Sequence, residues 1–455
     1  MQLNRQAYSQ LELWKANKKR KPLIIRGARQ VGKTTLIRQF SKTYKYSILL
    51  NLELESDLKY FQNYTEIHSI VEALFIQNNI TSSEKSQTLL FIDEIQESPE
   101  AIALLRYFYE MVPELHVIAA GSLLEHAISK VKSFPVGRVQ MLHLSPLNFI
   151  EFLDAIGHTA ALEQLSSIPV SIPANQVLKD LFHTYVIIGG MPEVVQEYAD
   201  TGSISGLTSI YESIWETYKN DVEKYASNAT ESRVIKHIMS TAHLFVDQRI
   251  KYQNFGNSNY RSREVSEAFR NLNDAKIIRL VLPTTDVQTP IKPDVRKSPR
   301  MQFLDTGIIN YELKIQADML AMDDLNNAYK GAIIPHVIYQ ELLSIETTKA
   351  SLPNFWVREK KFSSAEVDIV IQHKGLVFPI EIKSGKSGTL KSLHQFIEAA
   401  NHPYAIRMYA GEFSIESHST DSGKSYFLMN LPYYLGTKLF DYLDYFMKSY
   451  PLSKT

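Results

Sequence analysis

Residues 23–35 read Leu-Ile-Ile-Arg-Gly-Ala-Arg-Gln-Val-Gly-Lys-Thr-Thr, and the expected fold follows from this stretch. A short apolar run precedes the loop Gly27-x4-Gly32-Lys33-Thr34, and a helix-like segment continues from Thr35 to Phe40. Glycines at these positions let backbone N–H groups wrap a phosphate chain at the N-terminus of a helix. The order strand, loop, helix with this complete motif predicts a nucleoside-triphosphate site of the P-loop type.

The loop is expected to supply both phosphate and metal contacts. We expect Lys33 to reach the β- and γ-phosphates of ATP and the Thr34 hydroxyl to bind Mg²⁺. The nucleotide contacts expected in this segment come from Gly27, Ala28, Arg29, Gln30, Val31, Gly32, Lys33, Thr34 and Thr35.

Further apolar runs alternate with helix-like segments after the loop. Strands are expected at residues 46–52, 88–92 and 116–120, and helices at 66–77 and 99–109. This alternation is typical of a parallel sheet covered by helices on both faces, whose ligands gather at the carboxyl ends of the strands. The sequence therefore predicts an α/β protein that begins with a P-loop NTPase sheet.

Acidic and polar residues follow two of these strands. Asp93 is placed to hold the Mg²⁺ shell, and Glu94 beside it to orient or deprotonate the attacking water. The alternative for this pair is an acidic strand end that caps the next helix. Ser122 follows the next strand, either as a polar sensor of the γ-phosphate or as the N-cap of a helix at Leu123–Ser129.

Arg138, in Phe-Pro-Val-Gly-Arg-Val, has two interpretations. One is an arginine finger supplied by a neighbouring subunit, a role worth roughly 10³ to 10⁵ in rate where it operates. The other is a solvated strand residue. One sequence does not place a neighbour, so both interpretations stay open, and so does a homo-oligomer.

The middle of the chain is expected to be helical, with segments at 148–155, 175–186 and 204–224. Residues 250–285 predict two short helices and a hairpin, the outline of a winged helix. Arg261, Arg263 and Arg270 fall on or near its second helix, where they either enter a DNA major groove or belong to a structural packing module.

Residues 283–299 are rich in proline and charge and are expected to form a linker. This boundary predicts an ATPase domain at 1–155, a helical lid with the winged-helix region at 156–285, and a C-terminal α/β domain at 300–455.

The C-terminal region holds a second group of chemically capable residues. The expected elements are a helix at 332–346, strands at 355–359, 366–371 and 376–383, and a helix from Leu390. Glu381 and Lys383 alternate on one strand and share a face, and Asp368 on the partner strand can join them. Asp368 and Glu381 are therefore candidate ligands of a second divalent metal, with Lys383 as a third catalytic group. The alternative is the solvated face of a hairpin.

Composition narrows the classes of partner. The chain has 455 residues with 44% hydrophobic and 22% charged, which is typical of folded domains. Lys+Arg and Asp+Glu both number 49, so no global positive charge favours DNA or an anionic membrane. There is no cysteine, which excludes thiolate metal sites and disulfides. No apolar run approaches the roughly 18 residues of a membrane helix, and the chain is expected in the cytoplasm.

Four stretches together resemble a large prokaryotic family that pairs an AAA-type ATPase with a C-terminal domain of unknown function. The resemblance runs from about Leu13 to Phe396 and implies the additional-strand class of P-loop ATPases. The stretches are Arg26-Gly-Ala-Arg-Gln-Val-Gly-Lys-Thr-Thr, Leu90-Phe-Ile-Asp-Glu-Ile-Gln, Ala120-Gly-Ser-Leu-Leu-Glu and Gly189-Gly-Met-Pro-Glu-Val-Val.

The resemblance also implies roles for residues that no motif assigns. In related signalling ATPases a glycine-x-proline turn lies against the adenine, which here implies Gly190 and Pro192. The segment Tyr218-Lys-Asn-Asp-Val-Glu-Lys-Tyr is similar to the family but has no implied chemistry.

The Asp368, Glu381 and Lys383 pattern resembles restriction-endonuclease-like nucleases. That resemblance implies a further acid on the preceding helix, for which Glu341 is the candidate. Pro335 stands where glutamate is expected in this family.

Two functions follow. The first is an ATPase at Lys33, Asp93 and Glu94 that rearranges a winged-helix and nuclease-like half acting on DNA. The second is an ATP-regulated switch for protein partners, with a C-terminal domain that does not cut.

Overall fold

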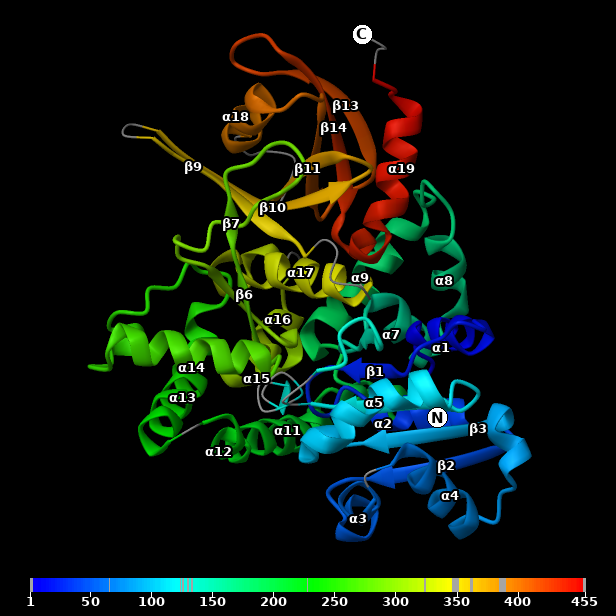
Figure 1. The fold of residues 1–455 in the computed structure, drawn as a ribbon. Coiled ribbons are helices and arrows are strands. Elements are labelled where there is room, and N and C mark those ends of the chain that lie inside the picture. The colour runs from blue at the N-terminus through cyan, green and yellow to red at the C-terminus, as the bar shows by residue number, and fades with distance from the viewer. Residues whose placement is uncertain are drawn as a thin grey trace.

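The computed structural model places a parallel sheet at one end of the molecule, a helical part in the middle and a second sheet at the other end (Figure 1). It describes residues 3–64, 66–122, 124, 127, 128, 131, 134–226, 228–322, 325–345, 352–360, 363–383 and 390–452. Within these ranges, no helix has the length and apolar character needed to cross a bilayer. The predicted fold class is confirmed as a parallel P-loop sheet, a helical region and a sheet-rich C-terminal part.

The N-terminal sheet has five parallel strands in the order β2-β3-β4-β1-β5. The strands are β1 (Leu23–Arg26), β2 (Tyr46–Asn51), β3 (Thr88–Asp93), β4 (His116–Gly121) and β5 (Gln140–His143). Strand β4 lies between β1 and β3, so the phosphate loop and the Asp93 strand are separated by one strand, as the additional-strand class implies. The sequence predicted the first four strands, and β5 is a further one.

Helices cover both faces of this sheet (Figure 1). Alternate strand residues point to opposite sides, so Ile25 packs with α2 (Lys33–Ser41) and Ile24 packs with α4 (Ile67–Gln77) in two separate hydrophobic clusters. α1 (Ala7–Ala16) joins the first cluster, and α5 (Pro99–Met111) the second; α3 (Glu55–Asn63) follows β2. The expected helix at Leu123–Ser129 falls largely outside the described residues.

The helical part begins where Asn148 caps α7 (Phe149–Ala155) in a reciprocal capping box with Glu151. It continues through α8 (Thr159–Leu165), α9 (Ala174–Ile188), α10 (Pro192–Thr201), α11 (Thr208–Asn220) and α12 (Val222–Tyr225). The amphipathic stretch at 204–224 was expected as one helix. It is instead divided into a short 3-10 turn at Ser205–Leu207, α11 and α12, with Asp221 between the last two.

The next segment combines α13 (Ala229–Thr241) and α14 (Ser262–Asp274) with β6 (Ile278–Val281) and β8 (Arg300–Phe303). β6 and β8 pair antiparallel, and Arg249 forms an isolated bridge with Arg300.

Residues 283–299 therefore connect two strands of one sheet. They are not a free linker, because β7 (Pro283–Thr284) also pairs with β9 (Asn354–Lys360) of the C-terminal sheet.

The C-terminal sheet has seven strands in the order β13-β14-β12-β11-β10-β9-β7. Its hairpin was predicted, with β10 and β11 antiparallel and Ile369 opposite Ile380. Its strands after β7 are β9 (Asn354–Lys360), β10 (Ser363–His373), β11 (Leu376–Ile382), β12 (Tyr404–Tyr409), β13 (Ser414–Ser419) and β14 (Ser425–Pro432). The accompanying helices are α15 (Thr306–Leu313), α16 (Gln316–Leu320), α17 (Ile333–Ile345), α18 (Lys391–Ala399) and α19 (Leu439–Ser449).

Buried polar groups join the helical part to the C-terminal part. Asp305, at the N-terminus of α15, accepts a hydrogen bond from Gly190 N (2.6 Å), and Gln340 donates to Tyr185 Oη (3.1 Å). Tyr185 also donates to Glu341 (2.7 Å). Asp305 and Glu341 are both fully buried, so their carboxyl groups depend on this interface for hydrogen-bond partners.

Glu341 gives this interface a pH dependence. Burial raises the pKa of Glu341 from its usual value of 4.5 to about 8, against the opposing effect of the Tyr185 hydrogen bond. The folded chain therefore holds a proton that the unfolded chain releases, so the stability contributed by Glu341 is complete below about pH 4.5 and is lost as the pH rises through 8.

Glu341→Gln should flatten this dependence, because a neutral amide of the same shape does not titrate. We expect the free energy of unfolding of the wild type to fall more steeply between pH 5 and pH 8, by up to about 1.4 kcal/mol per pH unit. Urea unfolding at four pH values measures both slopes. The exposed Glu72→Gln on α4 is the control and should keep the wild-type slope. Equal slopes in all three proteins would contradict the assignment.

Candidate functional site

The phosphate loop links β1 to α2 and requires its glycines. Gly32 has φ of 91°, in the left-handed region that side chains rarely adopt, and a Cβ on Gly27 would meet the Leu144 carbonyl oxygen at 2.3 Å. Within the loop, the Lys33 ammonium donates hydrogen bonds to the carbonyls of Gly27 (3.1 Å) and Ala28 (2.8 Å). The loop is thus closed around its own lysine.

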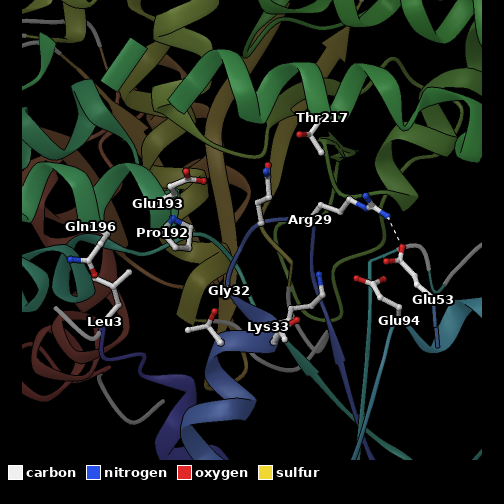
Figure 2. Close-up of a pocket in the computed structure, with 13 residues that line it drawn as sticks. Leu3, Arg29, Gly32, Lys33, Glu53, Glu94, Pro192, Glu193, Gln196 and Thr217 are labelled. Carbon is white, nitrogen blue, oxygen red and sulfur yellow. Dashed lines mark ion pairs between the residues drawn. The ribbon is translucent and has the colours of Figure 1, made fainter. Parts of the chain in front are cut away.

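A cavity of about 750 Å³ opens beside this loop (Figure 2). Figure 2 shows Arg29 and Glu94 on one side of it and Pro192, Glu193 and Gln196 on the other. Its lining is Leu3, Arg29, Gln30, Gly32, Lys33, Thr34, Thr35, Glu53, Glu94, Pro192, Glu193, Gln196 and Thr217.

Most of the predicted nucleotide contacts face this space, but not all do. Gly27, Ala28, Val31, Asp93 and Ser122 are not part of its lining. The lining residues that sequence reasoning missed are Leu3, Glu53, Glu193, Gln196 and Thr217. Only Glu53 had a usable signal, because it follows β2 at the same carboxyl edge of the sheet.

The charged centre of the cavity is Lys33. Burial lowers the pKa of Lys33 to about 8, while the nearby carboxylates of Glu94 and Asp93 act to raise it. A lysine with that pKa is still predominantly protonated at pH 7, so it presents a positive charge to the cavity.

Thr34 and Asp93 bring two hard oxygen atoms together. The Thr34 hydroxyl donates to Asp93 Oδ2 at 2.6 Å, and burial raises the pKa of Asp93. Glu94 N donates to the other Asp93 oxygen (3.1 Å), and the Gln96 side-chain amide donates to Glu94. This oxygen-only pair fits Mg²⁺, which prefers a carboxylate and hydroxyl with several waters.

Pro192 and Gly190 occupy different environments. A Cβ on Gly32 would lie 3.6 Å from the Pro192 ring, so the proline packs against the phosphate loop at the cavity. Gly190 does not line the cavity; a Cβ there would meet the Leu147 carbonyl oxygen at 2.0 Å, and its N–H donates to Asp305.

Ser122 and Arg138 lie outside the cavity lining. Ser122 is buried at the end of β4, and its hydroxyl has no hydrogen-bond partner among the described residues. Arg138 is half-exposed and its Nε lies 2.8 Å from Glu110 Oε1. Its side chain is held at the molecular surface by this ion pair.

Arg5 is a support that the sequence did not indicate. Its guanidinium donates to the carbonyls of Val31 (2.9 Å) and Ser145 (2.6 Å), and its Nε lies 3.1 Å from Glu151. Arg5 is distant in sequence from the phosphate-loop motif, so no local sequence pattern predicts its role. Its hydrogen bond to the Val31 carbonyl nevertheless holds the loop in place.

The C-terminal hairpin brings together the three predicted groups. Asp368 accepts a hydrogen bond from Ile382 N (2.9 Å), and Lys383 Nζ lies 2.7 Å from Glu381. Burial, together with the charge of Asp368, raises the pKa of Glu381 to about 7.

Arg300 of β8 points into this same group of acids. Its guanidinium lies 3.5 Å from Asp368 and 3.6 Å from Asp247, and it pairs with Glu366. Burial raises the pKa of Asp247 to about 7, against the effect of Arg300. Arginine and lysine thus face the carboxylates that were expected to face a metal.

The arrangement does not fit a resident divalent metal. No group of three or more His, Cys, Asp or Glu in the described part of the chain is placed to hold one. Glu341, expected as the further acid, instead accepts hydrogen bonds from Phe149 N (3.2 Å) and Tyr185.

Of the arginines expected to read DNA, Arg263 and Arg270 lie on α14 and Arg261 is the residue before it. Arg261 and Arg270 are exposed, and Arg263, with 87% of its side chain exposed, lies 3.0 Å from Glu267 one turn away. An acidic partner reduces the positive charge that this surface presents.

Comparisons with known proteins agree with the geometry of the first site. Residues 19–153 match the family model described as an AAA domain. The match and the strand order together support an AAA-type ATPase in the first third of the chain, with ATP and Mg²⁺ as its ligands. Two further family models, each described as a domain of unknown function, match residues 179–319 and 330–434.

No curated protein matches the chain. Among solved structures, the Hsp104–ADP complex of S. cerevisiae is 13% identical with a TM-score of 0.27, over 76% of this chain and 44% of that chain. A signal transduction ATPase (STAND protein) with a tetratricopeptide repeat sensor from Pyrococcus horikoshii is 10% identical with a TM-score of 0.28, over 76% and 48%. The chain spans less than half of each, so the AAA assignment rests on the family model and the sheet.

Arg300→Met should destabilise the protein, because it leaves Asp247 buried without its cation. We expect a loss of about 3 kcal/mol or more in the free energy of unfolding, measured with urea at pH 8. The double variant Asp247→Asn/Arg300→Met should recover part of this loss. Arg263→Met, whose ion pair is exposed, is the control and should leave the unfolding midpoint unchanged. A wild-type midpoint for Arg300→Met would contradict a structural ion pair.

Proposed function

We propose that this chain hydrolyses ATP at the cavity beside α2 and uses the cycle to alter how the AAA domain, residues 19–153, contacts the rest of the chain. One observation carries the proposal: Thr34 and Asp93 are paired at 2.6 Å, with Lys33 and Glu94 facing the same 750 Å³ cavity. Binding alone requires no acid beside Asp93, so Glu94 favours hydrolysis over storage of the nucleotide.

Each residue has a role that follows from its position. Loop N–H groups and Lys33 bind the β- and γ-phosphates, and Pro192 contacts the base. Thr34 and Asp93 hold Mg²⁺, which supplies charge neutralisation of the phosphates when bound. Glu94 accepts the proton of the attacking water, and the Gln96 amide orients the Glu94 carboxylate.

Two substitutions separate binding from turnover. Lys33→Ala should abolish ATP binding and phosphate release, because the cavity loses its positive charge. Glu94→Gln should still bind ATP but release phosphate at least about 100-fold more slowly, because the general base is lost. A phosphate-release assay with Mg²⁺ measures both. Arg38→Ala, exposed on the same helix as Lys33, is the matched control and should keep the wild-type rate. Wild-type turnover in Glu94→Gln would contradict the assignment.

Arg138 is a proposed finger for a neighbouring copy. Its place at the surface, outside the cavity of its own chain, is compatible with that role. The role makes turnover per molecule rise with protein concentration, since the neighbour must be present.

For the C-terminal half we propose a binding domain with a nuclease-like fold that does not cut DNA. The contacts of Arg300 and Lys383 support this, since both neutralise the acids that a metal would need. A nuclease is the second candidate, because Asp368, Glu381 and Lys383 come together on the hairpin. It requires a metal to displace Arg300 and Lys383 from these acids. DNA contact by the exposed face of α14, as a winged helix, belongs to the same proposal.

Linear and supercoiled DNA distinguish these candidates. With Mg²⁺ and ATP we expect both forms to stay intact on a gel, while fluorescence anisotropy at low salt shows binding that weakens steeply as salt increases. The variant Arg263→Ala/Arg270→Ala should weaken that binding. Cleavage by the wild type that is lost in Asp368→Asn would establish the nuclease instead, and no binding at low salt, with or without ATP, would remove DNA as a partner.

A further inference from the structure

Arg29 is the third residue of the phosphate loop, and its side chain lies in the nucleotide cavity. Figure 2 shows it between the loop and Glu53, on the same side as Glu94. Its Nε lies 3.0 Å from Asp221 Oδ2, and its Nη2 lies 3.7 Å from Glu53 Oε1. Its backbone carbonyl accepts a hydrogen bond from the Tyr218 hydroxyl at 2.6 Å.

These contacts connect the segment 218–225, for which the sequence implied no chemical role, to the phosphate loop. Tyr218 and Asp221 come from the end of α11 and the turn before α12, and both reach the same loop residue. Asp221 is 9% exposed and Glu53 is 45% exposed, so the pair with Asp221 is the better shielded of the two. Arg29 is therefore held by a carboxylate from the helical part at the edge of the cavity.

The charge of Arg29 already acts on the phosphate site. Burial is the main cause of the lowered pKa of Lys33, and the charge of Arg29 lowers it further. Burial also raises the pKa of Asp221, against the effect of Arg29. An arginine this near the lysine of the loop can bind a phosphate oxygen with its planar donor fork. A terminal phosphate carries more negative charge than either carboxylate, so it competes for the same guanidinium.

We propose that Arg29 binds the terminal phosphate of ATP from within the same chain, and that Asp221 holds Arg29 when that phosphate is not present. The proposal rests on the proposed function, since it assigns a further catalytic residue and a positioning residue to that site. ADP lacks the competing group, so Arg29 returns to Asp221 once the terminal phosphate leaves.

This exchange would transmit the state of the nucleotide to the helical part. Releasing Asp221 removes a contact that ties the α11–α12 turn to the loop and leaves the hydrogen bond from the Tyr218 hydroxyl. It also distinguishes Arg29 from Arg138: the contribution of Arg29 needs no neighbouring copy, whereas the contribution proposed for Arg138 rises with protein concentration.

The test compares ADP with a non-hydrolysable ATP analogue in direct binding titrations, alongside phosphate release from ATP. The variants are Arg29→Ala, Arg29→Lys and Asp221→Asn, with the exposed Arg38→Ala as control. Circular dichroism measures whether each variant folds. If Arg29→Ala does not fold, Arg29→Lys and Asp221→Asn, which keep a side chain of similar size, still test the proposal.

We expect Arg29→Ala to bind the ATP analogue at least about tenfold more weakly and ADP within about threefold of wild type, and to release phosphate at least about 100-fold more slowly. Arg29→Lys should fall between, since a point charge replaces the fork. Asp221→Asn should bind the ATP analogue about threefold to tenfold more tightly, with ADP unchanged, because the competitor for Arg29 is weakened. A merely structural Asp221 would change both affinities together.

The outcomes separate this inference from the proposed function. An unchanged ratio of ATP-analogue to ADP affinity in Arg29→Ala overturns the inference, even where the wild type hydrolyses ATP. A wild type that binds both nucleotides without turnover removes the ATPase proposal, while the affinity ratio still decides the role of Arg29. Turnover per molecule that depends on protein concentration and is lost in Arg138→Ala but not in Arg29→Ala assigns the finger to the neighbour instead.

Discussion

The hydrogen bond from Gly190 N to Asp305 is the contact on which the arrangement of the two halves depends. Asp305 is fully buried, and its carboxylate also accepts hydrogen bonds from Gly307 N and Ile308 N at the start of α15. Two residues after Gly190, Pro192 packs against the phosphate loop. A short turn therefore connects the nucleotide cavity to the C-terminal part, and separating Gly190 from Asp305 would remove one hydrogen-bond donor from a buried carboxylate.

Buried carboxyl groups are stabilised in different ways at the interface around Asp305 and at the hairpin around Asp368. Glu341 accepts hydrogen bonds from the neutral groups Phe149 N and Tyr185 Oη, and burial raises its pKa to about 8, so it is predominantly protonated at neutral pH. Asp247 and Asp368 instead share the guanidinium of Arg300. The contacts of Glu341 are therefore sensitive to pH. The contacts of Asp247 and Asp368 instead depend on one cation, Arg300 of β8.

The nucleotide cavity lies between the N-terminal sheet and the helical part. Its walls come from the phosphate loop, from Glu53 after β2, from α10 and from α11, so they include both the sheet and the helical part. A ligand that changes the position of Arg29 or Pro192 acts on segments that lead to α15 and α17. This geometry supports a cycle of ATP binding and hydrolysis that alters contacts between the halves, through packed elements with defined partners.

Elements that depend on neighbours along the chain could be predicted from the amino-acid sequence. Apolar runs and glycine positions predicted β1 to β4, the phosphate loop and the β10–β11 hairpin, because strand alternation and turn geometry are local properties. Which charged side chains contact one another depends on the three-dimensional fold. Arg300, predicted as part of no site, faces Asp368; Glu341 faces Phe149 N and not the hairpin; and Arg29 faces Asp221, almost two hundred residues away. Such pairs join residues far apart in the chain, and their energies depend on burial and distance, which no local pattern contains.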